Sequence, residues 1–235
     1  GVSDHCVTVE ARRLGGAFGG KESQPALFAS IAALVAKKTG RAAKLVLDRD
    51  DDMIMTGKRH DFLADYDVGF DELGVITGIS IHLASRCGMS LDLSGAINDR
   101  AMFHSDNAYF LENVRIQSER CKTHTVSNTA FRGFGGPQGM MVIERVIEAI
   151  ARDLGEDPLT IRKRNFYDLG QRNVTPYGMT VEDNIFDTLI PSLEASSDYW
   201  NRRKEITQFN ESSPVLKKGL ALTPVKFGIS FTATH

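Results

Sequence analysis

The sequence predicts an α/β to α+β fold in which mixed sheets carry flanking helices. Stretches whose apolar residues alternate, as in strands, are interleaved with stretches whose apolar residues recur at helical spacing. Two glycine-rich loops, residues 15–22 and 130–139, share a Phe-Gly-Gly core, and each precedes a helical stretch. The 235 residues are 42% hydrophobic and 25% charged, which is typical of a globular protein with one large or two small cores.

The first part of the chain is predicted to form a strand, a loop, a helix and a second strand. Residues 7–13 alternate like a half-buried strand, and residues 26–36 form a helix rich in small residues that ends at Gly40. The short apolar run 44–48 fits a buried strand. Residues 48–55 then predict a short helix with an acidic first turn.

A hairpin and a separate strand follow. Residues 61–70 and 75–84 are rich in strand formers, and the acidic turn 71–74 between them ends in glycine. Residues 89–109 are mixed and predict a loop with a helix. Residues 114–122 alternate again and lead toward the second glycine loop.

Helices dominate after the second glycine loop. Residues 140–151 place apolar side chains on one face and charges on the other, and this helix ends at Gly155. Pro158 begins another helix, at the position where proline is tolerated, and that helix ends near Gly170.

The composition then changes and suggests the domain division. A Pro/Gly loop opens at Arg172, and helices are predicted at residues 183–195 and 198–209 before a β-rich region at 217–232. We therefore expect a first subdomain at 1–171 that holds both glycine loops, a helical connection at 172–214, and the start of a second subdomain at 215–235.

Composition excludes several classes of protein. The formal net charge of -2 favours neither nucleic acid nor an acidic membrane surface as a partner. No apolar run approaches the ~20 residues that span a bilayer, and we expect a cytoplasmic protein. The three cysteines, Cys6, Cys87 and Cys121, are too widely spaced for a disulfide framework or an iron–sulfur motif.

The two glycine loops predict anion-binding sites. Glycine allows positive φ and a close approach of the backbone to a ligand, and the free N–H groups at the start of a helix attract negative charge. Two such loops in one chain predict a large polyanionic or oxo-rich cofactor held from two sides.

One interpretation of the first loop is a nucleotide-binding phosphate loop. Gly15, Gly20 and Lys21 have the required spacing, and the run ending at Asp48 imitates the acidic strand that holds magnesium. However, Glu22 stands where a Ser or Thr hydroxyl must bind the metal. A nucleoside triphosphatase therefore remains the alternative.

A second interpretation rests on resemblance. Residues 15–22 (GGAFGGKE) and 127–140 (SNTAFRGFGGPQGM) together resemble the molybdenum-binding region of the xanthine dehydrogenase and xanthine oxidase family. Residues 98–107 (NDRAMFHSDN) and 226–232 (KFGISFT) are similar to that family too. The resemblance spans essentially the whole chain, in order.

The resemblance implies part of a molybdopterin-binding domain of a molybdenum hydroxylase, an oxidoreductase that inserts water-derived oxygen into a heteroaromatic C–H. The cofactor-binding residues that it implies belong to both loops. In the family, the residues that match Phe18 and Arg132 approach the ligands of molybdenum through their backbone, so backbone N–H groups would act as donors. The implied cofactor contacts are Gly16, Ala17, Phe18, Gly19, Arg132 and Gly133.

The resemblance also implies a purine substrate, oxidised from hypoxanthine to xanthine to urate. Glu22 would hydrogen-bond the purine, and Arg100 would face the carbonyl on which negative charge accumulates. Phe134 and Phe231 would enclose the flat ring, and Thr232 would offer a hydroxyl. Aldehyde oxidases of the same family are expected to lack the Glu22 and Arg100 pair.

Other parts of the implied enzyme are expected elsewhere. The general base, a Glu, is expected beyond His235, and 2Fe-2S clusters and FAD on other domains or subunits of an oligomeric enzyme. The chain starts at Gly1 without Met, and we expect a fragment that is inactive alone. A third possibility is an inactive interaction module that kept the fold. None of the six histidines is assigned to a metal.

Overall fold

The computed structural model describes residues 3–8, 10 and 12–228. The chain divides into two compact units. The first unit comprises Gly1–Asp65, His82–Met102 and Ile116–Gln138. The second unit comprises Tyr66–Ile81, Phe103–Arg115 and Gly139–His235. The three strands contribute residues to both units, and both glycine loops belong to the first.

The sheet has three strands, β1 (Phe62–Phe70), β2 (Ile76–Gly88) and β3 (Val114–Lys122), in that order. Burial alternates along β1, as expected for a sheet with one covered face. The hairpin between β1 and β2 turns at Asp71, whose carboxylate accepts the N–H of Leu73 at 3.0 Å and of Val75 at 2.9 Å. The predicted hairpin and the strand at 114–122 are therefore confirmed.

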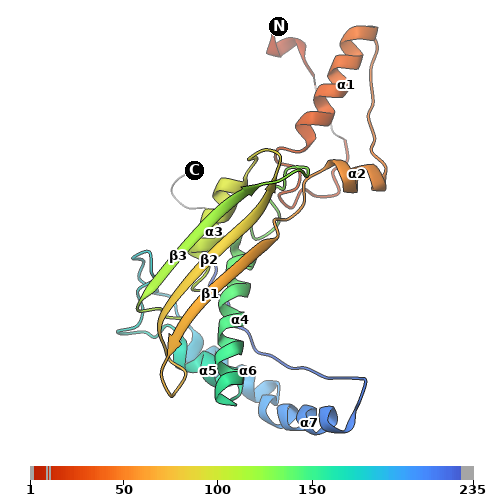
Figure 1. Ribbon diagram of the computed structural model, residues 1–235. Coiled ribbons are helices and arrows are strands. Elements are labelled where there is room, and N and C mark those ends of the chain that lie inside the picture. The colour runs from red at the N-terminus through yellow and green to blue at the C-terminus, as the bar shows by residue number, and fades with distance from the viewer. Residues whose placement is uncertain (1–2, 9, 11, 229–235) are drawn as a thin grey trace. The chain divides into compact units, whose positions relative to one another are not determined.

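The sheet is mixed, and Figure 1 shows β2 between β1 and β3. β1 runs antiparallel to β2, with which it forms the hairpin. β3 runs parallel to β2, because Ile79 N–H donates to Asn113 O at 2.9 Å and Thr123 N–H to Gly88 O at 3.0 Å. Helix α3 (Ser94–Phe103) makes the crossover between these parallel strands. The predicted α/β class with mixed strands is confirmed.

In the second unit, α4 (Gly136–Leu154) and α5 (Pro158–Asn165) both contribute side chains to the apolar core. Fully buried side chains recur along one face of α4, at Ile143, Ile147 and Ile150. Asp157 caps α5 by accepting the N–H of Leu159 at 2.8 Å, and Pro158 occupies the first turn. α5 ends at Asn165, earlier than predicted, because Phe166 leaves the helical conformation, with ψ 150°, and pairs with Tyr109.

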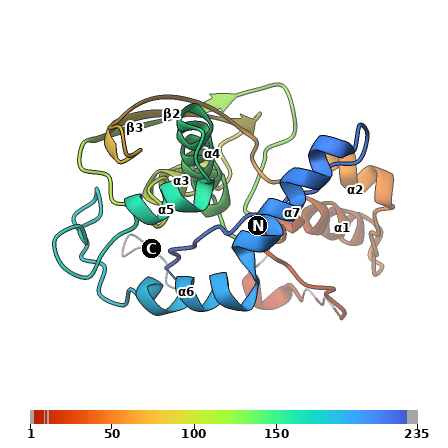
Figure 2. The ribbon, with the colours of Figure 1, turned by 90° about the horizontal axis from the view of Figure 1, so that it is seen from below.

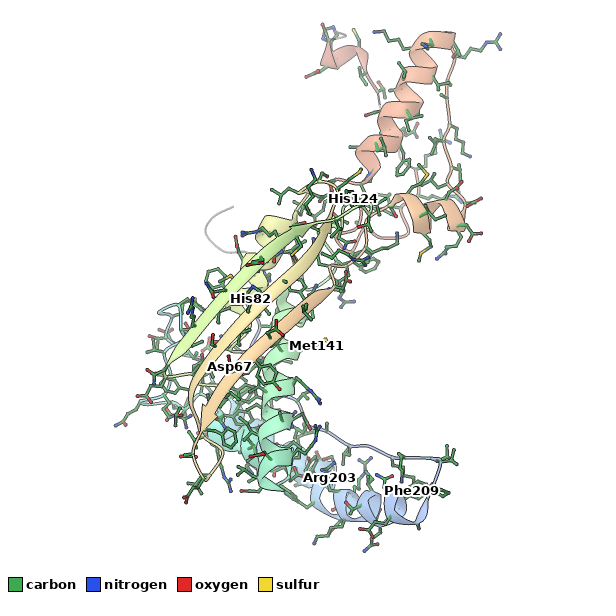
Figure 3. The ribbon with its side chains drawn as sticks, in the orientation of Figure 1. Asp67, His82, His124, Met141, Arg203 and Phe209 are labelled. Carbon is green, nitrogen blue, oxygen red and sulfur yellow. The ribbon has the colours of Figure 1, made fainter. Side chains whose placement is uncertain are left out.

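Two more helices of the second unit, α6 (Phe186–Ser196) and α7 (Tyr199–Ser212), follow one another closely (Figure 2). They confirm the helices predicted between residues 183 and 209. Arg203, labelled on α7 in Figure 3, donates to Asp157 at 2.8 Å. Tyr199 donates to the same carboxylate at 2.9 Å, so the N-cap of α5 also anchors α7.

The first unit contains a short 3-10 helix (Asp4–Cys6), α1 (Pro25–Thr39) and α2 (Arg49–Met55). α1 ends at Gly40, which has φ 65° and donates to Ala36 O at 2.9 Å, as the sequence predicts. Asp48 caps α2 by accepting the N–H of Asp51 at 2.8 Å. Both predicted helices are confirmed.

Three predicted β segments were wrong where the structure describes them. The described residues among 7–13 and all of 44–48 form no strand, and Val46 is 75% exposed. A strand needs a partner strand for its backbone hydrogen bonds, and no strand or bridge of the described chain pairs with these segments. Residues 217–228 are also not a strand, because side chains bind this backbone instead. Asn107 donates to Pro224 O at 3.0 Å and accepts the N–H of Lys226 at 3.1 Å. In the described part of the chain, no helix is both long and apolar enough to cross a membrane.

Candidate functional site

The first glycine loop is a tight turn built on left-handed backbone. Gly16, Phe18 and Gly19 have φ of 102°, 51° and 91°. The Phe18 ring folds back over Gly16, where a methyl group would overlap it. Gly20 N–H donates to Ala17 O at 2.9 Å and closes the turn. The loop is separated from the following helix by two residues, because α1 begins at Pro25.

The second loop repeats this backbone. Gly133, Phe134 and Gly135 have φ of 94°, 51° and 95°. A phenylalanine with positive φ is rare, and it precedes a glycine with positive φ in both loops. Here the helix does start within the loop, because α4 begins at Gly136. The segment that joins β3 to this loop passes through His124, labelled in Figure 3.

The two loops are in direct contact. Arg132 N–H donates to Phe18 O at 2.8 Å. A Cβ atom on Gly19 would lie 2.9 Å from the carbonyl carbon and oxygen of Ala130, closer than real Cβ contacts come. Glycine is therefore required at position 19 both for its φ and for the close approach of the second loop.

The second loop also packs against α3, the helix that carries Arg100. A methyl group on Gly135 would overlap Ile97 O and lie 3.1 Å from Ala101 N. Arg100 is half-buried in the last turn of this helix. The fold thus places the helix of Arg100 against the loop that holds Arg132 and Phe134.

The first loop presents a row of backbone donors. Among the residues that the structure describes, none accepts a hydrogen bond from the N–H groups of Gly16, Ala17, Phe18 or Gly19. Successive backbone N–H groups in a turn can form a concave anion site. Such donors fit the oxo and phosphate groups of a molybdenum-bearing pterin, so the loop is compatible with that cofactor.

Two charged side chains extend from the loops. Glu22 and Arg132 are exposed. Within the described part of the chain, the Glu22 carboxylate and the Arg132 guanidinium form no hydrogen bond or ion pair. Phe18 is 61% exposed, and Phe134 is half-buried. The remaining predicted substrate contacts, Phe231 and Thr232, lie outside the described residues.

Sequence reasoning missed the polar residues that support the loops. Asp92 accepts hydrogen bonds from Ser23, Gln24 and Thr129, and an aspartate just before a helix would ordinarily be interpreted as a cap. Arg59 donates to Arg132 O at 2.7 Å and lies over the Phe131 ring, with its guanidinium carbon 5.7 Å from the ring centroid.

His60 was also missed. This side chain is only 2% exposed, and its Nε2 lies 2.7 Å from Ser94 Oγ. Burial lowers the pKa of His60, against the attraction of the Asp92 and Asp61 carboxylates. A buried histidine among polar groups carries no periodic signal in the sequence.

The comparison with protein families agrees with this geometry. The chain belongs to the family of molybdopterin cofactor-binding domains, whose model matches residues 1–166.

Individual relatives extend the similarity to the rest of the chain. It is 44% identical to a xanthine dehydrogenase/oxidase from Mus musculus over 232 residues and 42% identical to a xanthine dehydrogenase from Calliphora vicina over 234 residues. A nicotinate hydroxylase from Emericella nidulans is 43% identical over 236 residues. These alignments cover 99% to 100% of this chain but 17% of each relative.

Solved structures show the same fold. The aldehyde oxidoreductase from Desulfovibrio gigas matches with a TM-score of 0.73 and 24% identity, over 86% of this chain and 21% of that one. A CO dehydrogenase from Oligotropha carboxidovorans matches with a TM-score of 0.74 and 22% identity, over 86% of this chain and 26% of that one. The predicted resemblance to molybdenum hydroxylases is confirmed. No finding supports the nucleoside triphosphatase, and the run 44–48 is not the strand that it needs.

Proposed function

We propose that this chain forms the first cofactor-binding part of a molybdenum hydroxylase that oxidises purines, from hypoxanthine to xanthine to urate. The observation that carries the proposal is the joined pair of glycine loops. Arg132 N–H donates to Phe18 O at 2.8 Å, while no described residue accepts a hydrogen bond from the N–H groups of residues 16–19 in the first loop. Close relatives named xanthine dehydrogenase, similar over the whole chain, support the same activity.

Molybdopterin, when bound, supplies the two-electron redox chemistry by which water-derived oxygen replaces a substrate hydrogen. The N–H groups of residues 16–19 bind the negative oxygens of the cofactor and fix its orientation. Arg132 N–H donates to Phe18 O, and this hydrogen bond fixes the distance between the two loops that would hold the cofactor.

The substrate residues act on the purine itself. Arg100 stabilises the negative charge that develops on a ring carbonyl, and this contact strengthens as the reaction proceeds. Glu22 hydrogen-bonds the purine and favours one tautomer. Phe134 covers one face of the ring, and Phe231 with Thr232 completes the substrate contacts.

Further parts of the proposal concern the whole enzyme. The general base is a Glu outside this chain, and 2Fe-2S clusters and FAD reside on other domains or subunits. We infer that the complete enzyme is oligomeric and cytoplasmic and that this chain alone is inactive. We also retain the division into subdomains at 1–171 and 215–235 with a helical connection at 172–214.

The preference for purines rests on the Glu22 and Arg100 pair. A relative named nicotinate hydroxylase is as similar as the xanthine dehydrogenases, so overall identity does not choose the substrate. The test is molybdenum analysis of the complete protein, followed by rates with hypoxanthine, xanthine, nicotinate and an aldehyde. We expect molybdenum near one per chain and the highest kcat/KM for a purine. A protein without molybdenum would overturn the enzyme class, and faster nicotinate turnover would overturn the substrate.

A further inference from the structure

We propose that Asp92 is a positioning residue that holds the two glycine loops in the arrangement that the cofactor requires. The inference rests on the proposed function and adds a residue to it. Asp92 belongs to neither loop and lies in the turn before α3.

Both carboxylate oxygens of Asp92 accept hydrogen bonds, and each accepts them from residues beside a different loop. Oδ2 accepts from Ser23 Oγ at 2.7 Å and from Gln24 Nε2 at 2.9 Å, directly after the first loop. Oδ1 accepts from Thr129 Oγ1 at 2.9 Å, directly before the second loop. One carboxylate therefore joins the flanks of both loops.

These contacts are part of a closed ring of hydrogen bonds. Gln24 Oε1 accepts the N–H of Gly57 at 2.9 Å. The next residue, Lys58, accepts the N–H of Thr129 through its carbonyl oxygen at 3.0 Å. The hydrogen bond from Thr129 Oγ1 to Asp92 closes the ring, so a shift of one member disturbs the bonds of the others. Thr129 is only 1% exposed, which restricts replacement of its bond by water.

A carboxylate is required at this position for a chemical reason. Three side-chain donors and the N–H of Leu93, at 2.6 Å, all point to Asp92, and an ionised carboxylate is a pure acceptor. In asparagine, an NH2 group replaces one carboxylate oxygen. Its two N–H groups would face two of these donors, which then lack an acceptor. Asp92 also has φ 44°, a left-handed conformation that aspartate tolerates better than most residues.

The ring of hydrogen bonds fixes the backbone next to two residues of the proposed site. Ser23 follows Glu22, and Thr129 precedes Ala130, the residue against which Gly19 packs. If the ring opens, the first loop can move relative to the second, and the N–H donors lose their fixed direction. A displacement of about 1 Å at such a site costs roughly 100-fold in rate.

The experiment compares Asp92→Asn with Asp61→Asn in the complete enzyme. Asp61 is a matched control in the same unit, since its ion pair with Arg86 at 2.9 Å is exposed. Molybdenum and pterin per chain, the melting temperature, kcat and KM are measured for both. We expect Asp92→Asn to lower bound molybdenum about tenfold or more, as lost charge-assisted hydrogen bonds imply, with a melting temperature near that of the control.

A second pair keeps the inference testable if Asp92→Asn does not fold. Thr129→Val keeps the shape but removes the hydroxyl donor, whereas Thr129→Ser keeps the donor. We expect molybdenum loss in the valine variant and retention in the serine variant. Full molybdenum content and unchanged kcat in both Asp92→Asn and Thr129→Val would overturn the positioning role while leaving the proposed function intact. A wild-type enzyme without molybdenum would instead overturn both.

Discussion

The backbone N–H of Arg132 donates a hydrogen bond to the carbonyl oxygen of Phe18 at 2.8 Å. These residues lie in glycine loops far apart in the sequence, and each loop has a phenylalanine with φ 51° next to a glycine with positive φ. The bond makes the two loops one structural element. A change in either loop is therefore expected to affect the ligand-binding geometry of both.

Gly19→Ala is expected to separate the loops. The new Cβ would lie 2.9 Å from the Ala130 carbonyl group, and alanine at φ 91° is strained by about 1–3 kcal/mol. We expect a lower melting temperature and reduced molybdenum content in the complete enzyme. Gly95→Ala is the control, because Gly95 lies in the first turn of α3 with nothing within 4 Å of the added atom. Equal effects of the two changes would contradict the packing argument.

Glu22→Val is expected to change the substrate preference. The exposed carboxylate is proposed to hydrogen-bond the purine, so its loss should lower kcat/KM for xanthine by about tenfold or more and spare or improve aldehydes. Steady-state rates with both substrates measure the ratio. Glu72→Val, in the exposed turn between β1 and β2, should leave the ratio unchanged. An unaltered ratio in the Glu22 variant would refute its role.

Arg100→Met is expected to slow turnover more than it weakens binding. If its contact strengthens as negative charge develops, kcat should fall roughly 100-fold while KM changes little. Arg120→Met is a suitable comparison, because Arg120 forms an exposed ion pair with Asp99 at 2.6 Å. Equal losses in kcat and in substrate binding would argue against electrostatic stabilisation by Arg100.

Arg162→Met is expected to destabilise the second unit. The Arg162 side chain is 1% exposed and pairs with Glu144 and Glu148, each at 2.8 Å. Removing the cation leaves the Glu144 carboxylate, 17% exposed, with hydrogen bonds from Tyr109 and Asn107 but no positive charge beside it, at a cost of about 3 kcal/mol. Arg86→Met, which removes an exposed pair with Asp61, should cost less than ~1 kcal/mol. Denaturant unfolding of both variants checks the difference, and similar losses would show that burial is not decisive.

Acidification is expected to destabilise the fold through His60. Its pKa is lowered by burial below the value of 6.5, so the unfolded chain binds a proton more readily than the folded one. The free energy of unfolding should therefore fall as pH drops below 6.5 and be insensitive to His60 above it, with a slope of at most ~1.4 kcal/mol per pH unit. His60→Gln cannot titrate and should flatten this part of the curve. A parallel pH dependence in both proteins would exclude His60 as the cause.

Local patterns were sufficient where an element makes its own hydrogen bonds or pairs with its neighbour in sequence. The helical spacing at residues 140–151 predicted α4, and the acidic turn at 71–74 predicted the hairpin of β1 and β2. The run 44–48 has strand-like composition yet stays unpaired, because a strand depends on a partner that composition does not specify. The strand predicted at residues 217–228 was wrong for the same reason, because the Asn107 side chain rather than a partner strand binds this backbone.

The sequence by itself determined the mixed α/β class, most helices and the two glycine loops, because helical periodicity and glycine runs act over a few neighbouring residues. It also identified the family, through motifs in which residue type alone is informative. Only the tertiary structure decided that Gly19 must accommodate Ala130, that Gly135 packs on α3, and that Asp92 joins both loops. Those relationships depend on distances between segments remote in sequence, and no local pattern encodes such a distance.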